Sequence, residues 1–270
     1  ADTVGATTLR KEHIKLTENS IEFDFLGKDS VRWRETIPAE GLDKQFHDNL
    51  KELIANKKNT QEIFHGITSR HVNAYYSTLV KGLTAKVFRT YLASSVVSKY
   101  LRDHDNIKSE SNMKKLFHAK MANLDSAIMC NHKRTIPKNF EQSLQKKKDT
   151  LSNVEKSKPW LKSEESLKKA ESIAQKTKKQ KERVKKIKIQ IRNRKAKHAE
   201  RIEKLQLQIK LTQKTRDHNL GTSLRNYIDP RIFKTWTDEV AAEWEKLYTS
   251  ALQKKFLWVK SDDSKWSEIS

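Results

Sequence analysis

The sequence has little cysteine, glycine or proline and no long hydrophobic run. Its single cysteine, Cys130, excludes an internal disulfide framework and is typical of a reducing compartment. No apolar stretch approaches the roughly 20 residues of a membrane-spanning helix. The first residues, ADTVGATTLRKEH, lack the apolar core of a signal peptide. These absences predict a soluble intracellular protein without disulfides or a membrane span.

Acidic residues are outnumbered, and the excess positive charge is concentrated in one segment. The 270 residues include 56 Lys and Arg against 34 Asp and Glu, a net charge of +22. From Lys133 to Arg216 there are 28 basic and 9 acidic residues, a net +19, which leaves +3 for the rest. Nucleic acid is the usual partner of so basic a chain, with an anionic membrane as the alternative. The pattern indicates a nearly neutral globular part interrupted by a basic insert.

The first forty residues alternate between apolar and polar with a period of two. Turn formers follow Leu16 and Phe25, so the segment is typical of an antiparallel β-meander with Lys28 at or beside a hairpin tip. The alternating apolar residues are Ile14, Leu16, Ile21, Phe23, Phe25, Val31 and Trp33.

Helical periodicity begins near Leu42. We expect a helix with Phe46, Leu50, Leu53 and Ile54 on one face. Further helices are expected over 69–80, after an N-cap at Thr84, and over 112–130 before Pro137. Arg89 lies in the helix that Thr84 caps, next to its most apolar part, with Val87, Phe88, Tyr91 and Val96.

The insert over 139–215 contains no glycine and one proline, Pro159. Its heptad-like spacing predicts a long antiparallel helical pair with a thin apolar seam. A single solvated helix or partial disorder remains open. The first side carries Leu144, Leu151, Val154 and Leu161; the second carries Val184, Ile187, Ile191, Ile202, Leu205 and Ile209, interrupted at Arg194, Lys195 and His198.

Beyond Gly221 the composition is again globular. Apolar residues spaced for one or two amphipathic helices predict that this piece packs back onto the first portion. Three tryptophans, Trp236, Trp244 and Trp258, are expected to be buried there.

Four short strings carry residues suited to chemistry: FLGKD, GLTAKVFRTY, CNHKR and SLRNYIDPR. Each alone has a structural explanation, such as a solvated hairpin lysine or a histidine that caps a helix. In this order, and with the basic insert between the last two, they resemble the eukaryotic type IB DNA topoisomerases from residue 1 to about Trp258. The resemblance implies a mainly α fold with a small N-terminal antiparallel β-meander, a catalytic fold shared with tyrosine recombinases, and a long antiparallel coiled-coil linker. The corresponding domains are a catalytic core subdomain over 1–138, a basic linker over 139–216 and a tyrosine-bearing C-terminal domain over 217–270.

The resemblance also implies residue roles. Tyr227 would attack a backbone phosphorus and hold the 3′ end as a phosphotyrosine, while Lys28 would protonate the leaving 5′ oxygen. Arg89 and His132 would bind non-bridging phosphate oxygens. Positions near the cleaved strand would be Asn131, Asp29, Thr222 and Asn226. No ATP, metal or other cofactor is expected.

These residue types suit phosphoryl transfer. A guanidinium presents paired donors to two oxygens, and each preorganised donor can be worth roughly 3–4 kcal/mol in the transition state. An alkoxide is a poor leaving group, so a lysine proton donor increases the rate. A phenol is mostly protonated at neutral pH, so it needs activation to act as a nucleophile.

Two departures from the family are visible. The family has a second catalytic arginine in a segment just before the ADTVG string, and no residue of this sequence aligns with that arginine. We therefore expect this chain alone to relax supercoiled DNA poorly or not at all. Leu224 stands where the family usually has lysine. The expected partner is double-stranded DNA, and no membrane partner is expected. We expect the chain to be monomeric or paired with a separate N-terminal topoisomerase fragment. The expected location is the nucleus rather than the mitochondrion.

Other classes of function remain open. A non-enzymatic basic coiled-coil DNA-binding protein would explain the charge, but it leaves the four strings as coincidence. A tyrosine recombinase would share the nucleophile but would need paired sites. A structural coiled-coil partner is disfavoured because the heptads are short. For a topoisomerase, the basic arm is hypothesised to slow rotation of the downstream DNA through phosphate contacts.

Overall fold

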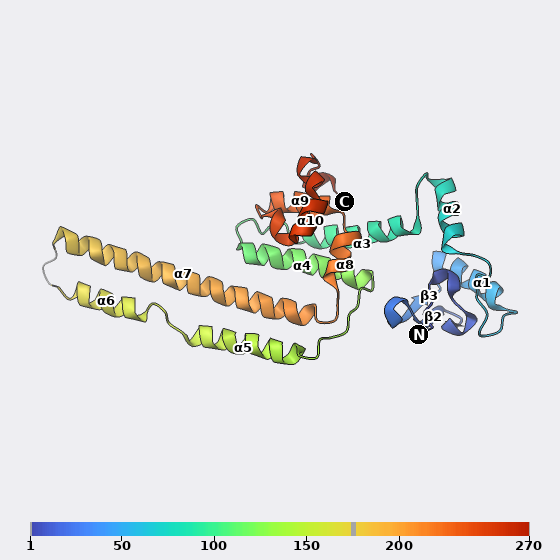
Figure 1. The fold of residues 1–270 in the computed structure, drawn as a ribbon, viewed down its shortest axis with the longest axis horizontal. Coiled ribbons are helices and arrows are strands. Elements are labelled where there is room, and N and C mark those ends of the chain that lie inside the picture. The colour runs from blue at the N-terminus through green and yellow to red at the C-terminus, as the bar shows by residue number, and fades with distance from the viewer. Residues whose placement is uncertain (1, 174–176, 270) are drawn as a thin grey trace. The chain divides into compact units, whose positions relative to one another are not determined.

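The computed structural model describes residues 2–173 and 177–269. The chain forms two compact units, Ala1–Phe88 and Arg89–Ser270. It is mainly helical, with one three-stranded antiparallel sheet in the first unit (Figure 1). Across the two described ranges, no helix combines the length and the apolar character that crossing a bilayer requires.

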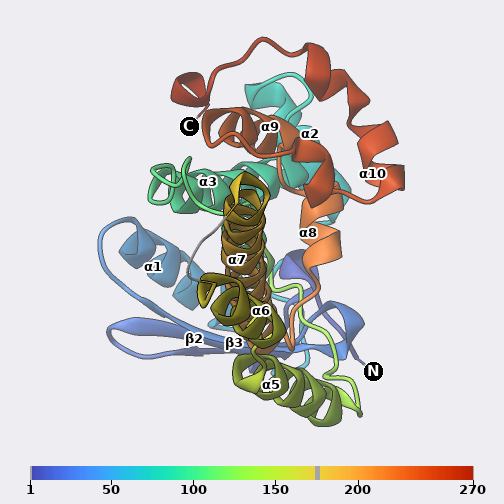
Figure 2. The ribbon, with the colours of Figure 1, turned by 90° about the vertical axis from the view of Figure 1, so that its left-hand side faces the viewer.

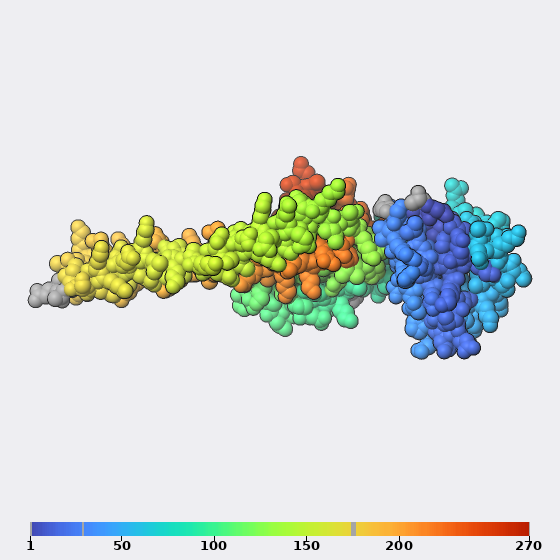
Figure 3. Space-filling model, turned by 90° about the horizontal axis from the view of Figure 1, so that it is seen from below, coloured from blue at the N-terminus to red at the C-terminus, as the bar shows by residue number. Residues whose placement is uncertain are grey.

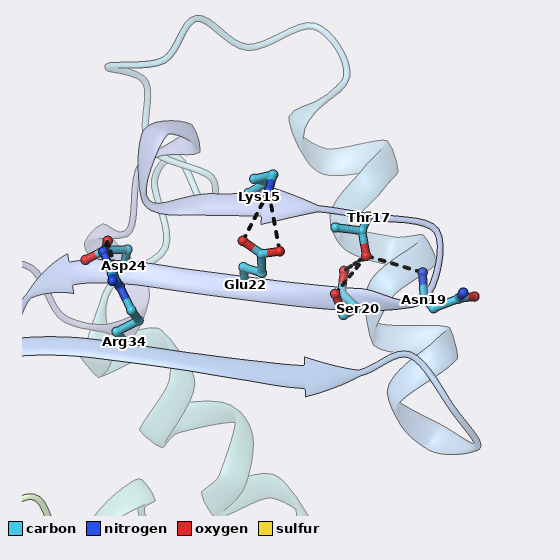
Figure 4. A network of polar contacts seen from close by, with 7 residues as sticks. All are labelled: Lys15, Thr17, Asn19, Ser20, Glu22, Asp24 and Arg34. Atoms are coloured by element: carbon cyan, nitrogen blue, oxygen red, sulfur yellow. Dashed lines mark hydrogen bonds and ion pairs between the residues drawn. The ribbon is translucent and has the colours of Figure 1, made fainter.

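The sheet confirms the predicted meander. Its strands β1 (Ile14–Leu16), β2 (Ser20–Leu26) and β3 (Arg32–Pro38) pair antiparallel in chain order. Cross-strand partners carry opposite charges: Lys15 Nζ lies 3.3 Å from a carboxylate oxygen of Glu22, and Arg34 lies 2.6 Å from Asp24 (Figure 4). Pairs of this kind favour the observed register over a one-residue slip.

Polar groups also secure the first hairpin and the far end of the sheet. The hydroxyl groups of Thr17 and Ser20 are 2.7 Å apart across the turn (Figure 4). At the other end, hydrogen bonds from Arg32 and Arg34 hold the pKa of the Asp24 carboxyl well below its usual range. This ion cluster lies on the strands that flank the turn bearing Lys28.

Helix α1 (Leu42–Ile54) packs on the sheet through a stripe that matches the expected one only in part. Leu50 is buried and Ile54 packs against the same core, as expected, but Phe46 and Leu53 are 39% and 42% exposed. Buried His47 joins the stripe instead, and its Nε2 lies 2.8 Å from the carbonyl oxygen of Thr17. A histidine that can hydrogen-bond the first hairpin therefore takes the core-facing position, and periodicity alone cannot choose between adjacent stripes.

Two further helices follow, α2 (Ser69–Leu79) and α3 (Ala85–Arg102), close to their predicted bounds. The core of the second unit combines α3 and α4 (Asn112–Met129) with the end of the chain. That end contains α9 (Pro230–Glu239) and α10 (Ser250–Lys255). The predicted packing of the C-terminal piece onto the earlier portion is confirmed. Buried members of this core include Val97, Leu101, Ala122, Phe233, Trp236, Trp244 and Phe256.

The expected burial of Trp258 is wrong: this residue is 51% exposed. It lies on a 3₁₀ turn, Leu257–Ser261, whose buried residue is Val259. Trp266, 8% exposed, instead completes the core together with Trp236 and Trp244. This tight turn buries Val259 and leaves the neighbouring Trp258 exposed.

The basic insert forms a helical arm. Helices α5 (Phe140–Lys156) and α6 (Leu161–Glu171) lie one after the other along α7 (Lys178–Lys214), antiparallel to it (Figures 1 and 2). Space-filling shows the arm extending from the body of the second unit (Figure 3). The predicted helical pair is thus present, except that its first side is two helices. Its buried seam includes Leu144, Val154, Ile191 and Ile209.

The interruption of the heptad pattern coincides with the break between α5 and α6. Arg194 of α7 donates to the carbonyl oxygen of Pro159 at 3.3 Å and to Ser163 Oγ at 2.7 Å. His198 Nε2 lies 2.8 Å from the carbonyl oxygen of Val154, and its ring meets Trp160 edge-on. These polar residues add hydrogen bonds to backbone carbonyl oxygens at the point where the first side of the arm is broken.

Candidate active site

Tyr227 lies at a junction between two helices, which explains the string NYIDPR. It is the C-cap of α8 (Leu220–Asn226), and its N–H donates to the carbonyl oxygen of Ser223 at 2.9 Å. Ile228 is buried in the core. Asp229 then caps α9 by accepting from the N–H of Arg231 at 2.9 Å, and Pro230 occupies its first turn. Fixed on both sides, the half-buried Tyr227 has a defined backbone position.

His132 is positioned by the way α4 ends. Asn131 adopts the left-handed conformation with φ 52°, its N–H bonds the carbonyl oxygen of Ile128, and the N–H of His132 bonds that of Ala127. This is the Schellman arrangement, in which asparagine is the usual substitute for glycine. The string CNH therefore encodes a helix end that presents the histidine.

The arm returns the chain to this helix end. Residues Lys133 and His218 form a bridge across the base of the arm, and the N–H of Asn219 donates to the carbonyl oxygen of His132 at 2.7 Å. On α8, Ser223 Oγ lies 2.6 Å from His132 Nδ1. Because the arm begins and ends at one place, His132 and Tyr227 meet although 95 positions separate them.

Arg89 on α3 completes the group. Its guanidinium carbon lies 5.0 Å from the centre of the Tyr227 ring, a cation–π distance, and it donates a hydrogen bond to the carbonyl oxygen of Cys130. The rings of His132 and Tyr227 are 5.2 Å apart, tilted by 37°. Although Arg89 lies next to the most apolar part of its helix, the residue is exposed. The structure brings three of the four predicted catalytic residues together.

The fourth, Lys28, belongs to the other unit. It is exposed and opens the 3₁₀ turn Lys28–Ser30 between β2 and β3, which confirms its predicted place at the hairpin. Lys28 and Tyr227 belong to different units, and the approach of Lys28 to Tyr227 stays a prediction. The backbone of Asp29 is in the same turn, but its side chain lies outside the described part of the structure.

The remaining predicted DNA-binding residues lie near Tyr227 and His132 along the chain. Asn131 and Thr222 are half-buried and Asn226 is exposed at the end of α8. Leu224, which departs from the family pattern, packs against the core of the second unit. Their contacts with DNA stay predictions.

Two serines that the sequence did not single out hold the site together. Ser223 contacts His132, as described above, and Ser94 of α3 accepts from the N–H of Asp229 at 3.0 Å. The same Ser94 hydroxyl lies 3.4 Å from the carbonyl oxygen of Tyr227. Serine in a helix carries no sequence signal of its own, so only proximity in the fold reveals these roles.

Asp229 also neutralises Arg231. Their side chains form a paired contact with a shortest distance of 2.6 Å, and the hydrogen bonds that Arg231 donates to this carboxylate raise the pKa of Arg231. Arg231 is therefore engaged beside the junction, whereas Arg89 is the guanidinium at the tyrosine ring. Among the described residues, no three metal-ligating side chains come together in a group that could hold a metal ion.

Comparison with known proteins matches the chain along most of its length. A family model described as "Eukaryotic DNA topoisomerase I, catalytic core" matches residues 1–165, and one described as "C-terminal topoisomerase domain" matches residues 199–268. DNA topoisomerase 1 of Caenorhabditis elegans is 35% identical over 96% of this chain and 31% of its own length. The human protein of that name is 34% identical over 96% of this chain and 34% of its own. The human protein named "DNA topoisomerase I, mitochondrial" is 33% identical over 96% and 43%. The chain thus spans about a third of the length of most of the curated relatives it matches, and it belongs to the eukaryotic DNA topoisomerase I family.

Proposed function

We propose that this chain carries the strand-cleaving machinery of a type IB DNA topoisomerase, which relaxes supercoiled double-stranded DNA without ATP or a metal ion. The observation that carries the proposal is the grouping of Arg89 and His132 around the ring of Tyr227. Membership of the eukaryotic DNA topoisomerase I family supports the same function.

In the proposed reaction, the phenol of Tyr227 loses its proton to solvent water as its oxygen attacks a backbone phosphorus. The new bond joins that oxygen to the 3′ phosphate, and the bond from phosphorus to the 5′ oxygen breaks. Lys28 gives a proton to the leaving 5′ oxygen, and Arg89 and His132 bind the non-bridging oxygens as charge builds on them. Religation is the reverse, and the phosphotyrosine conserves the bond energy, so no nucleotide is consumed.

Ser223 has a defined part in this proposal. When its hydroxyl donates to Nδ1 of His132, the imidazole proton resides on Nε2, which is then the nitrogen that can donate to a phosphate oxygen. Ser223 is a positioning residue here, since it acts through the histidine.

The arm is proposed to contact the downstream DNA and slow its rotation. A net charge of +19 between Lys133 and Arg216 supports this role. The salt dependence of DNA affinity falls as phosphate contacts are removed. Replacing the lysines of 178–197 with glutamine should therefore reduce that dependence and speed rotation. Unchanged values would leave the arm as a tether only.

The proposal is tested by trapping the covalent intermediate on a nicked suicide substrate. We expect a denaturant-resistant DNA adduct that Tyr227→Phe abolishes. Tyr91→Phe is the matched control, because Tyr91 is also a tyrosine of the second unit but is 65% exposed on α3. DNA binding without any adduct, with an added N-terminal topoisomerase fragment present, would favour the non-enzymatic DNA-binding protein. An adduct that survives Tyr227→Phe would show that the nucleophile is wrong.

The same proposal covers partners and location. The chain would act on DNA as a monomer or together with a separate N-terminal fragment that supplies the second arginine. A nuclear location is proposed, with the mitochondrion as the alternative. The human relatives named "DNA topoisomerase 1" and "DNA topoisomerase I, mitochondrial" match this chain almost equally well. Fractionation of cells that express the tagged protein would separate the two compartments.

A further inference from the structure

A groove of about 400 Å³ lies between α3 and α4 in the second unit. Part of its lining is apolar and part carries charge. The apolar lining residues are Val96, Tyr100, Ile128 and Met129, and the charged ones are Lys99, Asp103 and Asp125. The groove is open to solvent, since Ile128 is 53% exposed. An exposed apolar surface next to a few polar groups is typical of a place where another molecule binds.

The carboxylate of Asp125 distinguishes this groove from an ordinary hollow in the surface. The residue is half-buried, and it forms no hydrogen bond or ion pair with any residue that the structure describes. Burial raises the pKa of the Asp125 carboxyl, and the nearby His104 opposes this rise. The Nδ1 atom of His104 is itself engaged, 2.8 Å from the carbonyl oxygen of Tyr100. A carboxylate that has lost part of its hydration without gaining a partner is stabilised by a cation.

The groove is locally acidic on a strongly basic chain. Two carboxylates and one ammonium line it, a net charge of −1 where the whole chain carries +22. The ammonium belongs to Lys99, which is exposed and pairs with neither carboxylate in the described ranges. A DNA phosphate is repelled by this charge, so the groove is unsuited to nucleic acid. Its complementary occupant is a cation.

We propose that the groove binds a lysine or arginine side chain from a basic segment of a partner protein. The aliphatic stem of such a side chain packs along apolar surface while its charged head seeks polar partners. Here the stem lies on Ile128 and Met129, and the head pairs with Asp125. A free amine gains less, because an open groove surrounds it on one side only. A peptide adds contacts from the residues on either side of the basic one.

This inference goes beyond the proposed function, since strand cleavage uses neither Asp125 nor the groove. It gives the chain a contact with a protein in addition to its contact with DNA.

The test uses the full 270-residue chain and two short alanine peptides whose central residue is lysine or norleucine. Norleucine keeps the aliphatic stem of lysine and removes the ammonium. Methyl NMR titration should shift the signals of Val96, Ile128 and Met129, which line the groove. We expect the lysine peptide to bind about fivefold more tightly, which is the effect of one partly desolvated ion pair. The positive charge of the whole chain acts against the lysine peptide, so this preference reports the groove itself.

Asp125→Asn should make the two peptides bind equally, because it keeps the shape of the side chain and removes its charge. Asp105→Asn is the matched control and should preserve the preference. Asp105 is also a half-buried aspartate, but it lines a different hollow of the second unit.

A second variant keeps the test decisive if Asp125→Asn does not fold. Ile128→Lys changes an exposed residue one helical turn from Asp125, so it supplies the cation from within the chain and should abolish the preference for the lysine peptide. Equal affinity of the two peptides for the unmodified chain, or shifts that miss the groove methyl groups, would overturn the proposal. Binding of free butylamine as tight as that of the lysine peptide would exclude a protein partner. These readouts need no DNA, so they stand apart from any failure to form the tyrosine adduct.

Discussion

The contact between Ser223 and His132 offers the sharpest test of how the site is positioned. Ser223 is fully buried, and its Oγ lies 2.6 Å from His132 Nδ1. Replacing it with alanine removes one hydrogen bond of a half-buried imidazole, a loss of about 1–2 kcal/mol. Alanine is a better helix former, which returns about 0.5 kcal/mol to the stability of α8. The free energy of unfolding should therefore fall by about 0.5–1.5 kcal/mol, less than the usual total stability of a domain, so the chain should stay folded while the orientation of the imidazole is lost.

Under the proposed function, Ser223→Ala should slow single-turnover cleavage of a suicide substrate by a factor of roughly 5–30, because that is the kinetic equivalent of 1–2 kcal/mol. DNA affinity should stay unchanged. The nitrogen NMR signals of His132 should move towards a mixture of tautomers.

Ser95→Ala is the matched control, because its hydroxyl bonds only the carbonyl oxygen of Tyr91 in its own helix. Wild-type cleavage and unaltered His132 signals in Ser223→Ala would refute the positioning role. An equal loss of cleavage in Ser95→Ala would show that the effect is not specific to this contact.

Two predictions concern folding rather than cleavage. Asn131→Val should lower the free energy of unfolding by about 1–2 kcal/mol, because a β-branched residue is strained at φ 52°, whereas Asn131→Gly should be nearly neutral; urea denaturation of both variants checks this. Burial, assisted by the nearby His104, Lys114 and Lys210 and opposed by Glu110, lowers the pKa of His118 from 6.5 to about 4. Between these values the unfolded chain binds more protons, so stability should fall as the pH drops from 6.5 to 4. His118→Phe should flatten the melting temperature over that range, and an unchanged slope would exclude His118 as its source.

Much of the architecture follows from local sequence pattern. Alternation about Ile21 and Phe23 fixes the meander, because a strand with one buried face must alternate. Heptad-like spacing and the absence of glycine predict the arm. The string NYIDPR specifies two helix ends through an aspartate cap and a proline, which are local backbone preferences. Through the family resemblance that they carry, the strings also predict Tyr227, His132 and Arg89 as site residues.

Tertiary structure decided what depends on contacts between distant segments. The stripe of α1 that faces the sheet passes through His47 because a carbonyl of the first hairpin is within reach. The polar residues that interrupt the heptads lie opposite the break between α5 and α6, where Arg194 and His198 of α7 contact backbone carbonyl oxygens of the first side of the arm.

In the same way, Ser223 and Ser94 acquire their roles only in the folded chain, where α8 lies beside the end of α4 and Asp229 lies beside α3. Periodicity records which residues avoid water, which is a property of each segment by itself. Which hydrogen-bonding group a side chain meets is a property of two segments together, and so it appears only in the folded chain.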